Sequence, residues 1–266
     1  MQEYMTSTIK LGHKVSFVLW LIDQFSSLGC NEEVAVFLNG APANFQRKAG
    51  GYLVFTDLEE DQYQVAVSSP YYLTEHLVVK PSGLDRADPT VYIPLKPAPA
   101  YRFNPGTTLI RASLVTRQNE PLAAAITATI ISDICARARL GRQGAKSGTV
   151  ELPLVDVTGR LAPGDLLLIR SLDSKDGEIC EISSMGSGEG VYSLKNPLSM
   201  DHNRGDLLMP VVASCSDSRG EAVLALRQLR QKECRVQVEV GTGKSKSVQE
   251  VQITNGQVHQ LGKITV

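Results

Sequence analysis

The sequence lacks a long hydrophobic run and an excess of charge of either sign. Its longest apolar stretch, Val15–Ile22, has the length of a strand and is far short of the roughly 18 residues that span a bilayer. We therefore expect no membrane insertion. Lysine and arginine number 27 against 28 aspartates and glutamates, and this balance argues against a nucleic-acid partner, since nucleic-acid-binding domains carry a basic excess. Residues 1–12 lack a basic end followed by an apolar core, which predicts cytoplasmic synthesis without a Sec signal.

Closely spaced cysteine pairs are also missing. The five cysteines are widely scattered, and CxxC does not occur. Such a set in a reducing compartment predicts reduced, buried thiols. Cys180 and Cys234 lie in alternating apolar runs, where cysteine behaves as a small hydrophobic residue. The sequence does not exclude one disulfide, such as Cys215–Cys234.

Motifs that carry catalytic chemistry are few. The sequence has no HxH, HExxH or GxSxG, and these are the patterns expected of metal-dependent and serine hydrolases. Gly241–Ser245 resembles a phosphate loop, but Val238 stands where the Walker pattern needs glycine, and a strand pattern follows in place of a helix. A hairpin tip is the better interpretation. We expect no enzyme activity, no metal and no cofactor.

Period-two alternation, by contrast, is present throughout the chain. It is clearest in a set of short apolar segments: Val34–Leu38, Tyr63–Val67, Leu109–Val115, Val236–Val240 and Val248–Ile253. Turn dipeptides such as Asn-Gly and Pro-Gly separate these segments, a pattern typical of sandwiches and barrels. Ile134–Leu140 is the one plausible helix and is equally compatible with a strand. The sequence predicts an all-β fold.

An internal repeat organises these strands. Both copies contain a strand, a turn, a second strand, a glycine-led strand and then Leu-x4-[Tyr/Cys]-x-Val-x-Val, which is Leu58–Val67 in the first copy and Leu229–Val238 in the second. Residues 133–213 interrupt the second copy between its second and third strands. Insertion of a whole module is tolerated at an exposed hairpin tip, so we expect an inserted module there.

The repeat resembles the carboxypeptidase regulatory-like family of transthyretin-like β-sandwiches. The matching motifs are Thr116–Ala125 and Asp217–Glu221 in the second copy and Gly51-Tyr52 with Leu58–Val67 in the first. Asn119 replaces the family's usual turn glycine, and Cys234 replaces its usual tyrosine. The resemblance implies two transthyretin-like or Ig-like sandwiches and implies no catalytic activity.

Residues 133–213 repeat a Gly-Asp-apolar motif, in Pro163–Ile169 and again in Arg204–Pro210. With the short strands between them, they predict a small, partly closed β-barrel of about five strands. The expected organisation is a tail (1–12), a first β-sandwich with its Pro-rich linker (13–100), a second sandwich in two parts (101–132 and 214–266), and the inserted barrel (133–213).

This organisation favours a non-enzymatic structural or interaction protein whose partners are other protein subunits. Paired sandwiches that resemble this family occur as adaptors in bacterial assemblies such as phage-tail-like contractile particles. We therefore expect the site of action to be such an assembly, including a released extracellular particle. Val15–Ile22 is apolar on both faces, which predicts cover by the chain itself or by a partner.

The alternative is a carbohydrate-binding or adhesive module, with a glycan as partner. Tyr71 and Tyr72 follow Pro70 on a predicted loop, and exposed aromatic side chains commonly bind sugars. Polar loops of the inserted barrel, Asp173–Gly177, Gly186–Gly190 and Met200–Arg204, are the other candidates for recognition. The residues expected to contact a partner or glycan are Tyr71, Tyr72, Asp201, His202 and Arg204.

Overall fold

The computed structural model describes residues 14–171, 177–227, 229–242 and 246–266. Within them the regular structure is β-strands and two short 3₁₀ helices, η1 (Pro81–Gly83) and η2 (Asp133–Cys135), so the all-β prediction is confirmed. The plausible helix at Ile134–Leu140 is instead η2 followed by strand β12 (Ala138–Leu140). No helix in the described ranges is long and apolar enough to cross a membrane.

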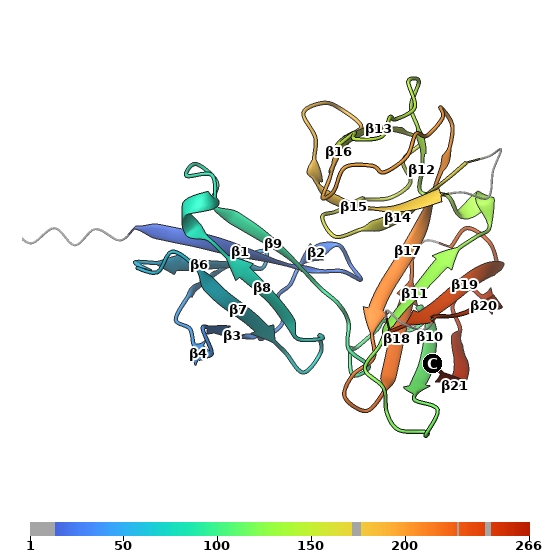
Figure 1. The fold of residues 1–266 in the computed structure, drawn as a ribbon, viewed down its shortest axis with the longest axis horizontal. Helices are drawn as coiled ribbons and strands as arrows, with labels where there is room; N and C mark the ends of the chain where they lie inside the picture. The colour runs from blue at the N-terminus through green and yellow to red at the C-terminus, as the bar shows by residue number, and fades with distance from the viewer. Residues whose placement is uncertain (1–13, 172–176, 228, 243–245) are drawn as a thin grey trace, which may run out of the picture.

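The first module is a sandwich of two sheets (Figure 1). One sheet has the order β2 (Leu28–Gly29), β1 (Val15–Asp23), β6 (Tyr52–Thr56), β5 (Gln46–Lys48), and β9 (Thr90–Leu95) pairs in parallel with β1. The other has the order β4 (Ala41–Pro42), β3 (Ala35–Leu38), β7 (Tyr63–Ser68), β8 (Glu75–Val79). Phe17 and Phe55, stacked with ring centroids 4.7 Å apart, lie in the shared core.

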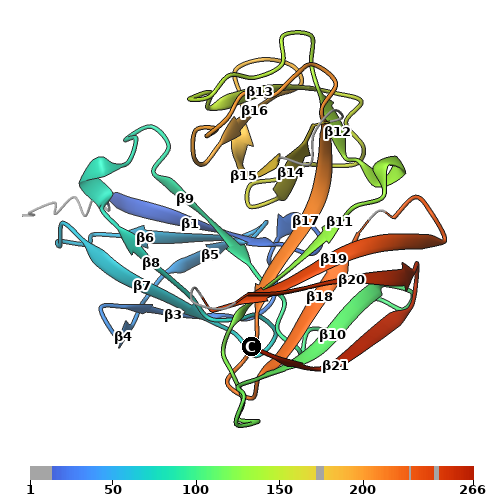
Figure 2. The ribbon, with the colours of Figure 1, turned by 45° about the vertical axis from the view of Figure 1, so that its right-hand side comes forward.

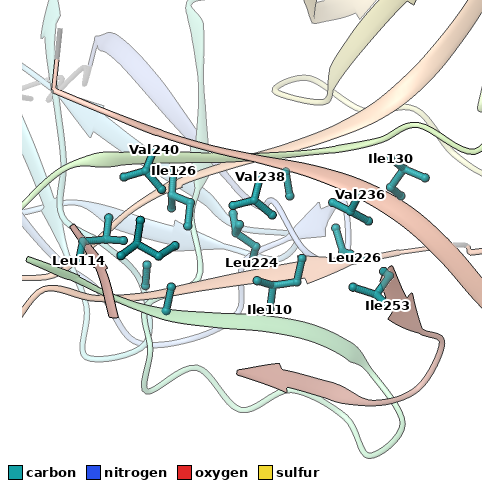
Figure 3. Close-up of a cluster of buried hydrophobic side chains, with 14 of the residues drawn as sticks. Ile110, Leu114, Ile126, Ile130, Leu224, Leu226, Val236, Val238, Val240 and Ile253 are labelled. Atoms are coloured by element: carbon teal, nitrogen blue, oxygen red, sulfur yellow. The ribbon is translucent and has the colours of Figure 1, made fainter. Parts of the chain in front are cut away.

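The second module pairs strands that lie far apart in the sequence. One sheet has the order β18 (Glu221–Leu226), β10 (Thr108–Val115), β21 (Val258–Thr265), and the facing strands are β17 (Leu207–Cys215), β11 (Ala125–Ile130), β19 (Glu233–Gly241), β20 (Lys246–Thr254). Figure 3 shows Ile110 and Leu224 meeting Ile126 and Val236 between the two layers. Residues 108–130 therefore share one core with residues after 214, the pairing on which an interrupted sandwich depends.

The inserted module contains β12 (Ala138–Leu140), β13 (Glu151–Val155), β14 (Leu166–Arg170), β15 (Gly177–Met185) and β16 (Val191–Leu194). With the start of β17, six strands pair in the order β12-β13-β16-β15-β14-β17, and β17 also pairs with β12. The module has its own apolar core. The barrel shape itself stays a prediction.

One strand, β17, belongs to both the insert and the second sandwich. Leu207 and Leu208 pair with β12, and Val211–Cys215 pair with β11. Figure 2 shows β17 running without interruption from the insert down into the sandwich. The two modules are therefore joined through a continuous hydrogen-bonded strand as well as through the connection before β12.

Candidate functional site

The predicted tyrosine pair is not the exposed aromatic site that the sequence suggested. Tyr72 is only 4 % exposed and lies in the core of the first sandwich, where its ring meets Tyr101 at 5.4 Å. The cause is a bridge between Tyr72 and Pro97, which lays the linker along the end of the sandwich and turns the Tyr72 ring inward. Tyr71 is partly exposed and carries the Arg102 guanidinium 4.9 Å above its ring.

An open cleft lies beside this bridge, between the two sandwiches. Its volume is about 490 Å³, and residues from the β7–β8 loop, the linker and the β17–β18 loop line it. Its charged side chains are mutually paired: Lys96 with Glu75 at 2.7 Å and Arg219 with Asp217 at 3.0 Å. The exposed thiol of Cys215 also lines it, which corrects the expectation that all five cysteines are buried. The cleft thus presents neutralised ion pairs and one accessible thiol.

A second junction joins all three modules at Arg227, which follows β18. Its guanidinium donates to the Phe25 carbonyl at 2.7 Å and to the Ser27 hydroxyl in the first module, and to Asp165 of the insert at 2.8 Å. The Asp165 side chain is 7 % exposed. The Arg227 side chain is 21 % exposed, so the pair is partly buried. Charge-assisted hydrogen bonds are stronger than neutral ones, and Arg227 therefore links the first module and the insert to the second.

The residues predicted on the Met200–Arg204 loop have three different environments. Asp201 is exposed and accepts from Lys146 at 2.7 Å. His202, expected in an exposed turn, is instead buried: its side chain is 2 % exposed and its Nε2 lies 2.9 Å from Glu178. The reason is a bridge between His202 and Ala145, which directs the imidazole into the module. Arg204 is exposed.

Glu178, which the sequence did not single out, anchors this loop. Burial opposes its ionisation, but hydrogen bonds from the Ser199 hydroxyl, the Ser199 N–H and His202 outweigh burial and lower the pKa of the Glu178 carboxyl below its ordinary value. His202 also lies 3.7 Å from the Asp206 carboxylate. The alternation of side chains along β15 does not predict this network, because the hydrogen-bond partners of Glu178 lie in a turn about 20 residues later in the sequence.

The outer face of the first sandwich carries an aromatic row. Phe17, Leu19 and Leu21 of β1 are buried, whereas Trp20 on the opposite face stacks on Tyr52 at 5.1 Å and lies 5.1 Å from Tyr92. Tyr92 is 38 % exposed. The two apolar faces predicted for Val15–Ile22 are therefore a core face and a partly exposed aromatic face.

Two other predicted features can be placed in part. Strands β19 and β20 pair antiparallel, with Gly241 opposite Lys246, as a hairpin around Gly241–Ser245 requires; residues 243–245 themselves lie outside the described ranges. So do residues 172–176, most of the predicted recognition loop Asp173–Gly177. Among the described residues, no group of three or more His, Cys, Asp or Glu side chains could hold a metal ion.

Comparison with known proteins assigns no family. No family model matches the chain, and no curated protein matches it. A solved chain described as a Streptococcal ancillary pilin aligns with 96 % of this chain and 68 % of its own length, at 10 % identity and a TM-score of 0.26. Identity and TM-score this low establish neither a common fold nor a common function.

Proposed function

We propose that this chain is a non-enzymatic adaptor that joins other protein subunits in a larger bacterial assembly. The observation that carries the proposal is the junction at Arg227, where one guanidinium bonds to two other modules at once. An adaptor has to present separate surfaces in a fixed relative orientation, and partly buried, charge-assisted hydrogen bonds between modules support that rigidity.

The aromatic row of Trp20, Tyr52 and Tyr92 is the surface proposed to meet a protein partner. Aromatic residues are enriched in the buried centres of protein interfaces, and tyrosine and tryptophan contribute large contact areas with little loss of side-chain entropy. The Trp20 and Tyr52 rings stack on each other, 12° from parallel, so their flat faces are partly used within the row. This geometry supports a protein partner better than a sugar, which needs a free ring face.

The more specific proposal, an accessory component of a phage-tail-like contractile particle, rests on the resemblance of the two repeats to transthyretin-like sandwiches. That resemblance also supplies the proposed bacterial origin.

The experiment is size-exclusion chromatography of the full chain mixed with each product of the genes adjacent to its own. Tyr92→Arg places a charge in the aromatic row, and Val78→Arg is the matched control, since Val78 is 56 % exposed on β8 of the opposite sheet. We expect the wild type and Val78→Arg to co-elute with a partner and Tyr92→Arg to elute alone.

A monodisperse monomer with every product would overturn the adaptor proposal. Co-elution that survives Tyr92→Arg would move the interface away from the aromatic row. Glycan-array binding that Tyr92→Arg abolishes, without any protein partner, would instead establish the carbohydrate-binding alternative.

A further inference from the structure

Three arginines line an open pocket on the inserted module. Arg139 comes from β12, Arg142 from the turn that follows, and Arg204 from the turn before β17. The pocket has a volume of about 300 Å³, and Asp156 is its only acidic residue among those described. It is separate from the cleft between the sandwiches and from the aromatic row.

The two turns that carry Arg142 and Arg204 pack directly on each other. The Gly205 N–H donates to the Leu140 carbonyl at 3.0 Å. Gly144 has a positive φ of 62°, and a Cβ there would lie 2.4 Å from the His202 carbonyl oxygen, so only glycine permits this approach. The arginines are therefore attached to backbone whose position is fixed.

The buried network around His202 holds the second of these turns from beneath. His202 contacts Glu178 at 2.9 Å, and the Asn203 N–H donates to Asp206 at 2.9 Å. Arg204 is thus an exposed side chain on an anchored turn. Binding sites are most precise when interior hydrogen bonds orient the groups that touch the ligand, and the carboxylates of Glu178 and Asp206 serve this purpose here.

The charges in the pocket are not balanced. Asp156 lies 3.9 Å from Arg139, and its side chain is 75 % exposed, which makes a weak pair. Within the described part of the chain, the side chains of Arg142 and Arg204 form no hydrogen bond or ion pair. Like charges that share one cavity repel each other, and a bound anion would remove the repulsion. The planar guanidinium fork matches tetrahedral oxyanions and binds them through two parallel hydrogen bonds.

We propose that this pocket is a binding site for a phosphate group, with Arg142 and Arg204 as the principal donors and Arg139 at its edge. The phosphate can belong to a free phosphate compound or to a phospholipid headgroup, since both present the same oxyanion to the arginines. The site goes beyond the adaptor function and does not depend on it.

The test measures two phosphate sources with the full chain. Isothermal titration calorimetry with pyrophosphate probes the free form, and flotation with phosphatidylcholine vesicles containing phosphatidic acid probes the lipid form. Because a charge-assisted hydrogen bond contributes about tenfold in affinity, we expect the double variant Arg142→Ala/Arg204→Ala to weaken binding at least tenfold in the arm that gives a signal. Arg86→Ala/Arg117→Ala removes the same charge from exposed positions elsewhere and should leave binding unchanged.

The double variant Arg142→Lys/Arg204→Lys keeps both positive charges but lacks the planar guanidinium groups. We expect its affinity to lie between the wild type and the alanine pair. Circular dichroism melts verify that each variant is folded, and Arg142→Gln alone replaces the double variant if that one is not. The proposal is overturned if neither phosphate source binds the wild type, or if the alanine pair and the control pair lose affinity equally.

Discussion

Arg227 and Asp165 form an ion pair of 2.8 Å between the second sandwich and the insert, and the same guanidinium also bonds to the Phe25 carbonyl of the first module. Arg227→Met removes these donors and leaves a buried carboxylate. We expect the free energy of unfolding to fall by about 2–4 kcal/mol, measured by urea denaturation. Arg219→Met, which breaks an exposed pair, should cost less than about 1 kcal/mol. Equal losses would mean that Arg227 does not hold the modules together.

The Glu178 network makes the free energy of unfolding of the insert depend on pH. Because the folded-state pKa of Glu178 is lowered, its contribution is complete above its ordinary value of 4.5 and is lost as pH falls through the lowered pKa. Glu178→Gln should cost about 1–3 kcal/mol at pH 7, and the difference from the wild type should shrink towards pH 3. Thermal melts from pH 7 to 3 measure this, with the exposed Glu189→Gln as control. A difference that is constant with pH would show that the carboxylate charge is not what matters.

Thiol reactivity distinguishes Cys215 from the other cysteines. Cys215 is exposed and the rest are buried; burial raises the pKa of Cys180 to about 12 and that of Cys234 to about 11. Since the thiolate is the reactive species, one thiol per folded chain should react rapidly with Ellman's reagent. Cys215→Ser should abolish this fast phase, whereas Cys30→Ser should keep it. A fast phase that persists in Cys215→Ser would contradict the assignment.

The first strand shows how far its sequence determines its environment. Alternation in Val15–Ile22 predicts two apolar faces, and the structure places Phe17 in the core and Trp20 outside. Nothing local decides which face is inside, because Tyr52 and Tyr92 reach Trp20 from distant strands. Phe17→Ala should cost about 3–5 kcal/mol, and Trp20→Ala should cost less. The reverse order in chemical denaturation would contradict this placement.

The candidate sites were harder to predict than the strands, and His202 and Tyr72 show why. Both residues belong to segments that read as polar or turn-like, so local pattern predicts exposure. Each is buried by a single backbone bridge, to Ala145 and to Pro97 respectively. Such bridges join segments through tertiary packing and leave no periodicity in the sequence. Arg142 and Arg204 likewise meet only because two turns distant in the chain come into contact.

Asn119 is a position where sequence and structure agree on the backbone. The resemblance to transthyretin-like sandwiches implies a turn glycine at this position. The φ of Asn119 is +63°, in the left-handed region, and its side-chain oxygen accepts a hydrogen bond from Lys263 at 2.9 Å. Asparagine tolerates this region better than other non-glycine residues. Asn119→Ala should therefore cost about 1–2 kcal/mol in urea denaturation. Asn119→Gly should stay within about 0.5 kcal/mol of the wild type, because relief of backbone strain offsets the lost exposed contact. Gln118→Ala, in the same turn without a positive φ, is the control; if alanine at 119 were tolerated as well as glycine, the conformation would not be what selects asparagine there.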